Sequence, residues 1–126
     1  MEQNCIDIRD QIMSQKLVKS VADALYIIGG KWKLPIIIAL FAQSKRFNDL
    51  KRAVEGISAR VLSNELKDLE ANGFIKRRVY AEDTPVTVLY ELTEYSNSLE
   101  EVVLALGNWG ESHLMKLKTG LKEVQS

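Results

Sequence analysis

The clearest pattern of hydrophobic and polar positions in the chain lies between Ser58 and Asn72. At about 100° per residue, one side of a helix over this stretch carries leucines, namely Leu62, Leu66 and Leu69. The other side carries polar side chains, namely Arg60, Ser63, Asn64 and Lys67. Ser58 can cap the start of this helix, and Gly73 can end it. We therefore predict an amphipathic helix with one packed face and one free face.

The segments before this helix predict further helices. In order, they are a weak amphipathic arm from about Ile6 to Leu17, a helix from Val18 to Ile28 that stops at Gly29 and Gly30, a helix that begins near Lys31 or Trp32, and a short helix around Phe47, Leu50 and Val54 that Gly56 breaks. Pro35 falls in the first turn of the third, where it is tolerated because the first helical N–H groups have no internal partner.

After Gly73 the pattern changes to extended segments. Phe74–Tyr80 and Val86–Leu92 are rich in β-branched and aromatic residues and flank Ala81–Pro85, which predicts a two-stranded hairpin. Thr93 can cap a final long helix. The apolar stripe of that helix is wider than a monomeric helix needs, which suggests a dimer interface, although ordinary core packing is the alternative; its residues are Leu99, Val102, Val103, Leu106, Trp109, Leu114 and Leu117.

The order helix, helix, short turn, helix, hairpin is that of a winged helix-turn-helix. The predicted fold class is therefore mostly α with a small β-hairpin wing (α+β), flanked by N- and C-terminal helices, whose role as dimerisation helices is implied by the family resemblance given below. The predicted division of the chain is a helical arm over residues 1–17, a winged helix-turn-helix domain over residues 18–92, and a dimerisation helix over residues 93–126. At 126 residues, the chain has the length of one domain with helical arms.

Composition indicates an ordinary soluble globular protein, with 46% hydrophobic and 27% charged residues. Early charges such as Glu2 and Asp7 argue against a signal peptide, and the apolar stretch Leu34–Ala42 is too short to span a bilayer. We expect a cytoplasmic protein with no membrane partner. Cys5 is the only cysteine, so an internal disulfide and a cysteine-based metal cluster are excluded. No cofactor and no metal site are predicted.

The distribution of charge along the chain points to a nucleic-acid partner more strongly than the net charge does. The net charge is zero, which argues against a generic nucleic-acid binder. Between Lys45 and Arg78, however, nine basic residues stand against five acidic ones, a local excess of +4. Random clustering on a solvated surface is the alternative explanation. Whether this excess forms a binding surface depends on where the fold places these residues.

The helix from Ser58 to Asn72 has the side chains to read DNA in a major groove about 12 Å wide. Arginine pairs with guanine, asparagine with adenine, and serine with either or with phosphate, so base or phosphate contacts are expected from Ser58, Arg60, Ser63 and Asn64. Ser58 can also be a plain N-cap. Backbone contacts are expected from Lys67, Arg77, Arg78 and Lys45. The hairpin cations can instead keep a strand edge soluble, and Glu82 and Asp83 at the tip would repel phosphate.

Several short motifs occur in a family-specific order. They are Ile28-Gly29-Gly30-Lys31-Trp32, Arg46-Phe47-Asn48-Asp49-Leu50, Gly56-Ile57-Ser58 with Arg60-Val61-Leu62, Leu66-Lys67-Asp68-Leu69-Glu70, Gly73-Phe74-Ile75 and Tyr90-Glu91-Leu92-Thr93. Over about Val21 to Glu111 the chain resembles the HxlR-type family, which groups with MarR-like winged-helix regulators. The resemblance implies dimeric DNA-binding repressors or activators of bacteria, with the first and final helices at the dimer interface.

Three positions depart from the family pattern. Many members carry a Cys-Pro about ten residues before the Gly-Gly-Lys-Trp motif, a cysteine that senses oxidants or electrophiles in some; here that position is near Lys19, and Cys5 lies well upstream. Redox sensing by Cys5 is therefore a hypothesis. Thr87 and Leu89 replace family residues in the wing, which puts wing contact with DNA in question, and Ser96 stands where glycine is usual.

An enzyme is not expected. The only histidine, His113, and Cys5 lie at opposite ends of the chain, and Gly29-Gly30-Lys31 lacks the spacing of a phosphate loop. The preferred function is a sequence-specific regulator that binds double-stranded DNA as a homodimer, on an inverted repeat with half-sites about 34 Å apart or a multiple of that. The alternative is a winged-helix module that binds protein and not DNA. A small-molecule effector is possible, but no residue identifies one.

Overall fold

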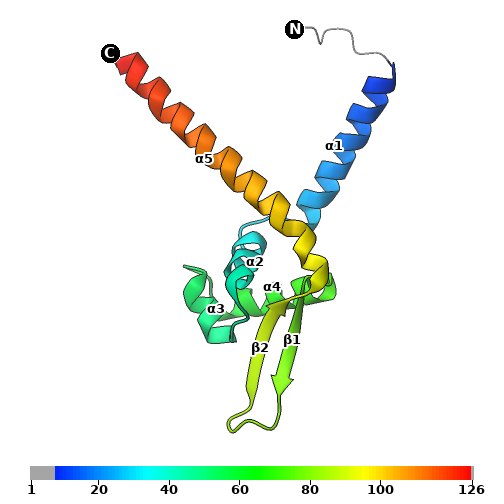
Figure 1. Cartoon of the computed structure of the whole chain (residues 1–126), viewed down its shortest axis with the longest axis vertical. Helices are drawn as coiled ribbons and strands as arrows, with labels where there is room; N and C mark the ends of the chain where they lie inside the picture. The colour runs from blue at the N-terminus through cyan, green and yellow to red at the C-terminus, as the bar shows by residue number, and fades with distance from the viewer. Residues whose placement is uncertain (1–7, 126) are drawn as a thin grey trace.

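The computed structural model describes the backbone of residues 8–125 and the side chains of residues 9–120. Helices dominate, and the strands form one two-stranded antiparallel sheet (Figure 1). In chain order the elements are α1 (Ile8–Ile28), α2 (Lys33–Ala42), α3 (Phe47–Ala53), α4 (Ala59–Ala71), β1 (Ile75–Tyr80), β2 (Thr87–Leu92), the 3₁₀ turn η1 (Glu94–Ser96) and α5 (Asn97–Gln125). The predicted class, mostly α with a small hairpin, is confirmed.

Helix α1 is one continuous helix, so the expectation of two separate helices before Gly29 was wrong. The sequence around Leu17 and Val18 holds no glycine or proline that would end a helix, and the boundary predicted there falls inside α1. The helix ends at Gly29, whose N–H donates to the Leu25 carbonyl at 2.8 Å. A Cβ at position 29 would lie 2.2 Å from that carbonyl oxygen, so this close approach requires glycine.

The hydrophobic core lies between α2, α3, α4 and the start of β1. The α4 leucines predicted to face inward are at most 2% exposed, and burying each stabilises the fold by about 1.5–3 kcal/mol. The buried core consists of Ile28, Ile36, Ile37, Leu40, Leu50, Val54, Ile57, Leu62, Leu66, Leu69, Phe74 and Ile75. Pro35 lies in the first turn of α2, as predicted. The helix-turn-helix is thus packed around one continuous apolar cluster.

The hairpin gains a third, one-residue strand that the sequence pattern did not predict. Lys45 exchanges two main-chain hydrogen bonds with Tyr90, from the Lys45 N–H to the Tyr90 carbonyl at 3.0 Å and from the Tyr90 N–H to the Lys45 carbonyl at 2.8 Å. In β1 and β2, Arg77 pairs with Tyr90 and Arg78 with Leu89. Since cross-strand partners share a face of the sheet, Lys45, Tyr90 and Arg77 form one row, and Arg78 lies on the other face.

The start of α5 is attached to the connection between α4 and β1. Thr93 was expected to cap the long helix, and this was wrong: its hydroxyl donates to the Gly73 carbonyl at 2.5 Å and to the Phe74 carbonyl at 3.3 Å. Ser96 is fully buried and also donates to the Phe74 carbonyl. The turn η1 separates Thr93 from the first residue of α5, Asn97. Two hydroxyls therefore fix α5 to this connection, here called the Phe74 junction.

Helices α1 and α5 diverge from the body in a V, and the hairpin extends from the opposite side (Figure 1). Many apolar side chains along both helices are exposed, among them Leu17 at 63%, Trp109 at 68% and Leu117 at 51%. No single helix among residues 8–125 is long and apolar enough to cross a membrane, and only the pair 9–28 and 33–42, bent by 73°, passes that test together.

Candidate nucleic-acid interface

The exposed face of α4 begins at a capped N-terminus. The Ser58 hydroxyl oxygen accepts a hydrogen bond from the Val61 N–H at 3.1 Å, so the predicted N-cap is confirmed. Arg60, Asn64 and Lys67 are exposed. In the part of the chain that the structure describes, none of these three side chains makes a hydrogen bond or ion pair. They are therefore available to an external partner.

Two of the carboxylates on α4 are neutralised from α2. The Lys33 ammonium lies 2.5 Å from a Glu65 carboxylate oxygen and 3.6 Å from one of Asp68. The side chains of Lys33 and Glu65 are only 17% and 21% exposed. Hydrogen bonding to Glu65 raises the pKa of Lys33 above 10.5, with the charges of Glu65 and Asp68 acting in the same direction against burial. This pairing leaves the free face of α4 more positive than its sequence suggests.

Arg77 shares one surface with α4. An open hollow between α4 and the wing is lined by Ser63, Leu66, Lys67, Glu70, Arg77 and Tyr90. It places two cations, Lys67 and Arg77, and two hydroxyl-bearing residues around one space, with Glu70 as the opposing carboxylate. Lys45 is half-buried and lies in the same row of the sheet as Arg77. The structure thus brings three of the predicted backbone contacts to the α4 side of the wing.

Arg78 lies on the other face of the wing. Its guanidinium is 2.7 Å from a Glu91 carboxylate oxygen, and the Lys76 ammonium is 3.5 Å from the same oxygen. Hydrogen bonding to Glu91, followed by the negative charge of Glu91, raises the pKa of Arg78. The structure therefore does not bring Arg78 together with Arg77, although the sequence suggested a common role for the pair.

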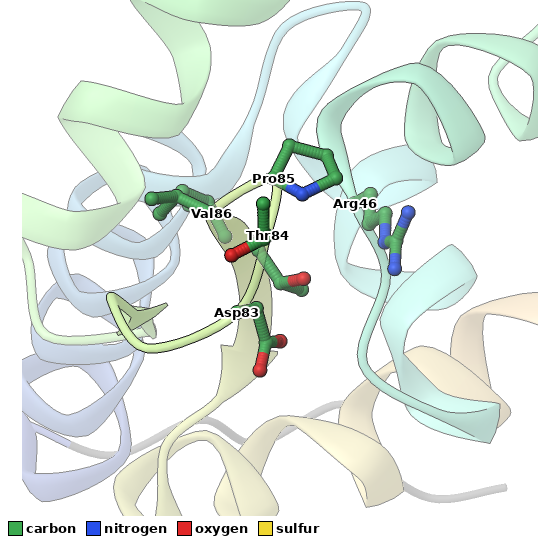
Figure 2. A pocket seen from close by; sticks show the side chains of 7 residues that line it. Arg46, Asp83, Thr84, Pro85 and Val86 are labelled. Atoms are coloured by element: carbon green, nitrogen blue, oxygen red, sulfur yellow. The ribbon is translucent and has the colours of Figure 1, made fainter.

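A second hollow, which sequence reasoning did not anticipate, lies between α3 and the wing loop. Figure 2 shows the Arg46 side chain beside this loop, with Asp83 on another side of the space. The lining residues are Arg46, Asp83, Thr84, Pro85, Val86, Thr87 and Val88. No sequence pattern singles out Arg46, which precedes α3 at its N-cap position.

The predicted dimer residues differ in exposure. Leu99 and Val103 are half-buried, and Leu99 packs against the core of its own chain. The others are at least 43% exposed, and they are Val102, Leu106, Trp109, Leu114 and Leu117. Trp109 stacks on His113 with ring centroids 5.0 Å apart. Cys5, the predicted redox sensor, lies outside the described residues.

The described side chains show no metal-binding cluster: no three or more His, Cys, Asp or Glu residues among them lie close enough to hold an ion. Apart from the Glu70 carboxylate, the polar side chains on the exposed face of α4 and in the hollow beside it carry cationic, hydroxyl and amide groups. Such groups bind phosphate and base edges. The chemistry of this surface is therefore that of nucleic-acid recognition.

Comparison with known proteins decides the family. The family model described as HxlR-like helix-turn-helix matches residues 27–118. This chain belongs to that family. The HxlR-like chain is 42% identical over 98 residues to the HTH-type transcriptional regulator YtcD of Bacillus subtilis (strain 168), covering 78% of this chain and 77% of YtcD.

Solved structures agree with this assignment. The reduced form of the redox regulator HypR superposes with a TM-score of 0.72 at 39% identity, covering 79% of this chain and 98% of HypR. A MarR-family regulator from Enterococcus faecalis V583 gives a TM-score of 0.70 at 37% identity, covering 78% of this chain and 88% of that chain. The HxlR-like chain is therefore a winged-helix, DNA-binding regulator of transcription and not an enzyme. The alternative of a protein-binding module is not favoured.

Proposed function

We propose that the protein binds an inverted-repeat operator as a homodimer, with α4 of each protomer in the major groove of one half-site. The observation that carries this proposal is the free polar face of α4, flanked by Arg77 and backed by Lys33, which neutralises Glu65 and Asp68. Recognition helices of helix-turn-helix dimers enter successive major grooves about 34 Å apart. Two-fold symmetry of the protein then demands an inverted repeat.

Base reading is assigned to Arg60 and Asn64, because both are exposed near the N-terminal end of α4 and match guanine and adenine edges. Ser58 and Ser63 are assigned to bases or phosphates at the same end. Backbone contacts are assigned to Lys67, Arg77 and Lys45, which supply positive charge around the hollow between α4 and the wing. Arg78 contacts phosphate only if DNA displaces Glu91.

The partner copy is proposed to cover the apolar faces of α1 and α5. These faces are exposed in the single chain over several turns, as on α5 with Leu106, Trp109, Leu114 and Leu117. Exposed apolar patches of this extent mark interaction sites. Identical protomers related by a two-fold axis would bury the same patch on both sides. The dimer therefore supplies the second α4 that an inverted repeat requires.

The test begins with selection of binding sites from random DNA by the purified protein. An enriched inverted repeat would support the proposal, and no enrichment would contradict it. On the selected site, Arg60→Ala should cost about 1–3 kcal/mol and relax preference at one base position per half-site. Lys67→Ala should weaken all sequences alike and lower the salt dependence. Equal, sequence-independent losses in both variants would remove base reading from Arg60.

The proposed place of action is the cytoplasm, where the operator DNA of a bacterial cell lies. A small-molecule effector stays a prediction without an assigned residue. The expected absence of a membrane partner also stays a prediction. None of these three predictions affects the proposed DNA-binding role of α4.

A redox response through Cys5 is a second candidate, favoured by the similarity to HypR, a redox regulator whose structure has an oxidised and a reduced form. With one cysteine per chain, no disulfide can form within a chain, and the reversible products open to Cys5 include a sulfenic acid, a mixed disulfide and a disulfide between chains. The test is DNA binding before and after diamide, for the wild type and for Cys5→Ser. An equal response in both proteins would exclude Cys5 as the sensor.

A further inference from the structure

The hollow between α3 and the wing loop has the composition of an anion site. One cation, Arg46, stands at one side, and the hydroxyls of Thr84 and Thr87 lie among the lining side chains. Pro85, Val86 and Val88 supply apolar walls. Figure 2 shows Arg46 and the loop residues around this space. A guanidinium with nearby hydroxyls and apolar walls suits a phosphodiester joined to a deoxyribose.

Arg46 is available for such a contact. Its side chain is exposed, and within the described part of the chain it makes no hydrogen bond or ion pair. Arg52, inside α3, differs in this respect because its guanidinium is paired with Asp49. Of these two arginines, the one at the N-cap of α3 is unengaged, and it lines the hollow.

The hollow also has a suitable place in the fold. In a helix-turn-helix, the first helix crosses the DNA backbone while the second lies in the major groove. Here α3 is the first helix and α4 the second. The bridge between Lys45 and Tyr90 fixes the residue before Arg46 to β2, so the start of α3 and the wing are held together. A DNA strand that borders the groove filled by α4 would meet both elements.

We propose that the hollow between Arg46 and the wing loop binds one backbone phosphodiester of the operator, with the Arg46 guanidinium as the charged donor. This inference rests on the proposed insertion of α4 into the major groove. It also answers how the wing meets DNA although Glu82 and Asp83 lie at its tip: the contact runs through the side of the loop that faces α3. Phosphate contact at this position adds affinity and register but reads no base.

Asp83 has a defined role in this arrangement. Its carboxylate lines the same hollow and carries the sign that repels phosphate. It therefore weakens the phosphate contact of Arg46. Asp83→Asn should tighten DNA binding, and this gain should depend on Arg46. Opposite changes from the two substitutions would also follow from a general charge effect, so the decisive result is that the gain from Asp83→Asn disappears when Arg46 is removed.

The experiment measures the affinity of the full-length protein for the selected operator by fluorescence anisotropy over a series of KCl concentrations. Arg46→Gln is compared with Arg52→Gln, which removes the same charge six residues away, inside α3. Arg46→Gln should lower the slope of log K against log salt by about 1 per half-site and weaken binding about tenfold at low salt, equally on all sequences. Arg52→Gln should change both quantities much less. Circular dichroism checks that each variant is folded.

A cycle of variants locates the contact. Asp83→Asn should strengthen binding in the wild-type background and leave it unchanged in Arg46→Gln. A methylphosphonate that neutralises one operator phosphate should weaken the wild type but not Arg46→Gln. Equal slopes for the Arg46 and Arg52 variants would overturn the inference. An operator affinity that Arg46→Gln leaves unchanged would also overturn it, even if the hollow binds inorganic phosphate saturably, because the site would then not hold the operator backbone. Loss of sequence preference in Arg60→Ala tests the role of α4 separately.

Discussion

At the scale of single residues, Arg77 and Arg78 show that two arginines next to each other on a strand can have different roles. Arg77 lines the hollow beside α4, and Arg78 is held by Glu91 on the other face of the hairpin. Successive side chains of a strand point to opposite faces, so neighbouring arginines cannot share one phosphate surface. The register pairs, Arg77 with Tyr90 and Arg78 with Leu89, fix which face each one takes.

This difference makes a matched pair of variants. Arg77→Gln should lower the salt slope of operator binding by about 1 per half-site, because one phosphate contact is lost. Arg78→Gln removes the same charge but should leave the slope nearly unchanged, since Glu91 already neutralises that guanidinium. Anisotropy titrations at several salt concentrations measure both slopes. A larger change for Arg78 than for Arg77 would show that DNA approaches the other face of the wing.

Ser58 offers a test of two roles in one side chain. Ser58→Ala removes the acceptor for the Val61 N–H and should destabilise the protein by about 1 kcal/mol in urea unfolding. Ser58→Asp keeps an N-cap acceptor and should restore stability, because acidic residues suit helix N-termini. If Ser58 also contacts phosphate, the aspartate variant should be stable and yet bind DNA more weakly. Full binding by Ser58→Asp would leave Ser58 a cap alone.

At the scale of elements, Lys33 joins α2 to α4, the proposed recognition helix, through Glu65 and Asp68. Lys33→Met should destabilise the fold by about 1–3 kcal/mol, because two carboxylates lose their partner and one of them is mostly buried. DNA binding should also weaken, since these charges then repel phosphate from α4. Lys31→Met is the control, as Lys31 is exposed and lies 4.8 Å from the ring centroid of Trp32. A larger stability loss in the control would contradict the role of Lys33.

The pH dependence of this pair has a definite sign. The pKa of Lys33 is raised in the folded protein above the ordinary 10.5, chiefly by the hydrogen bond to Glu65. Its contribution is therefore fully present below pH 10.5 and is lost as the pH rises through the higher folded-state value. The stability difference between wild type and Lys33→Met should stay constant from pH 7 to about pH 10 and shrink above that. Urea unfolding across this range measures it.

Elements whose side chains pack within the chain were predictable from the sequence. The α4 leucines repeat at helical spacing because they pack on the chain's own core, and the hairpin stands out by its β-branched residues. The continuity of α1 was not predicted, because many of its apolar residues are exposed in the single chain and show only loose spacing. The sequence indicated that Thr93 caps the final helix, but its hydroxyl instead donates hydrogen bonds to the carbonyls of Gly73 and Phe74.

The residues of the candidate site also divide into those that the sequence predicts and those that it does not. Arg60, Asn64 and Lys67 could be predicted because helical periodicity alone assigns them to the exposed face. Arg46 could not, because its relation to the wing depends on a one-residue bridge at Lys45 that leaves no periodic signal. The opposite placement of Arg77 and Arg78 was available from strand alternation. The pairing of Arg78 with Glu91 additionally needed the register.

At the scale of the whole molecule, the apolar faces of α1 and α5 are exposed along two helices that diverge from the body (Figure 1). Leu106→Glu places a charge in the α5 stripe and should dissociate the proposed dimer, because burying an unpaired carboxylate is costly. Light scattering coupled to size exclusion measures the mass, and the same variant should lose affinity for the inverted repeat. Leu104→Glu is the control, since Leu104 is also exposed, at 60%, but lies on another side of α5. Monomers in both variants, or in neither, would contradict the assigned face.

The Phe74 junction has a mechanical consequence. It is the fulcrum of a lever: α5 is 29 residues long, about 44 Å at 1.5 Å per residue, and its near end is fastened by Thr93 and Ser96 to the point where α4 passes into β1. If two such levers cross in a dimer, a small change in their angle swings both recognition helices about that fulcrum. The distance between the two α4 helices then changes while the helical repeat of DNA stays fixed, so operator affinity can be regulated without unfolding any part of the helix-turn-helix or the wing.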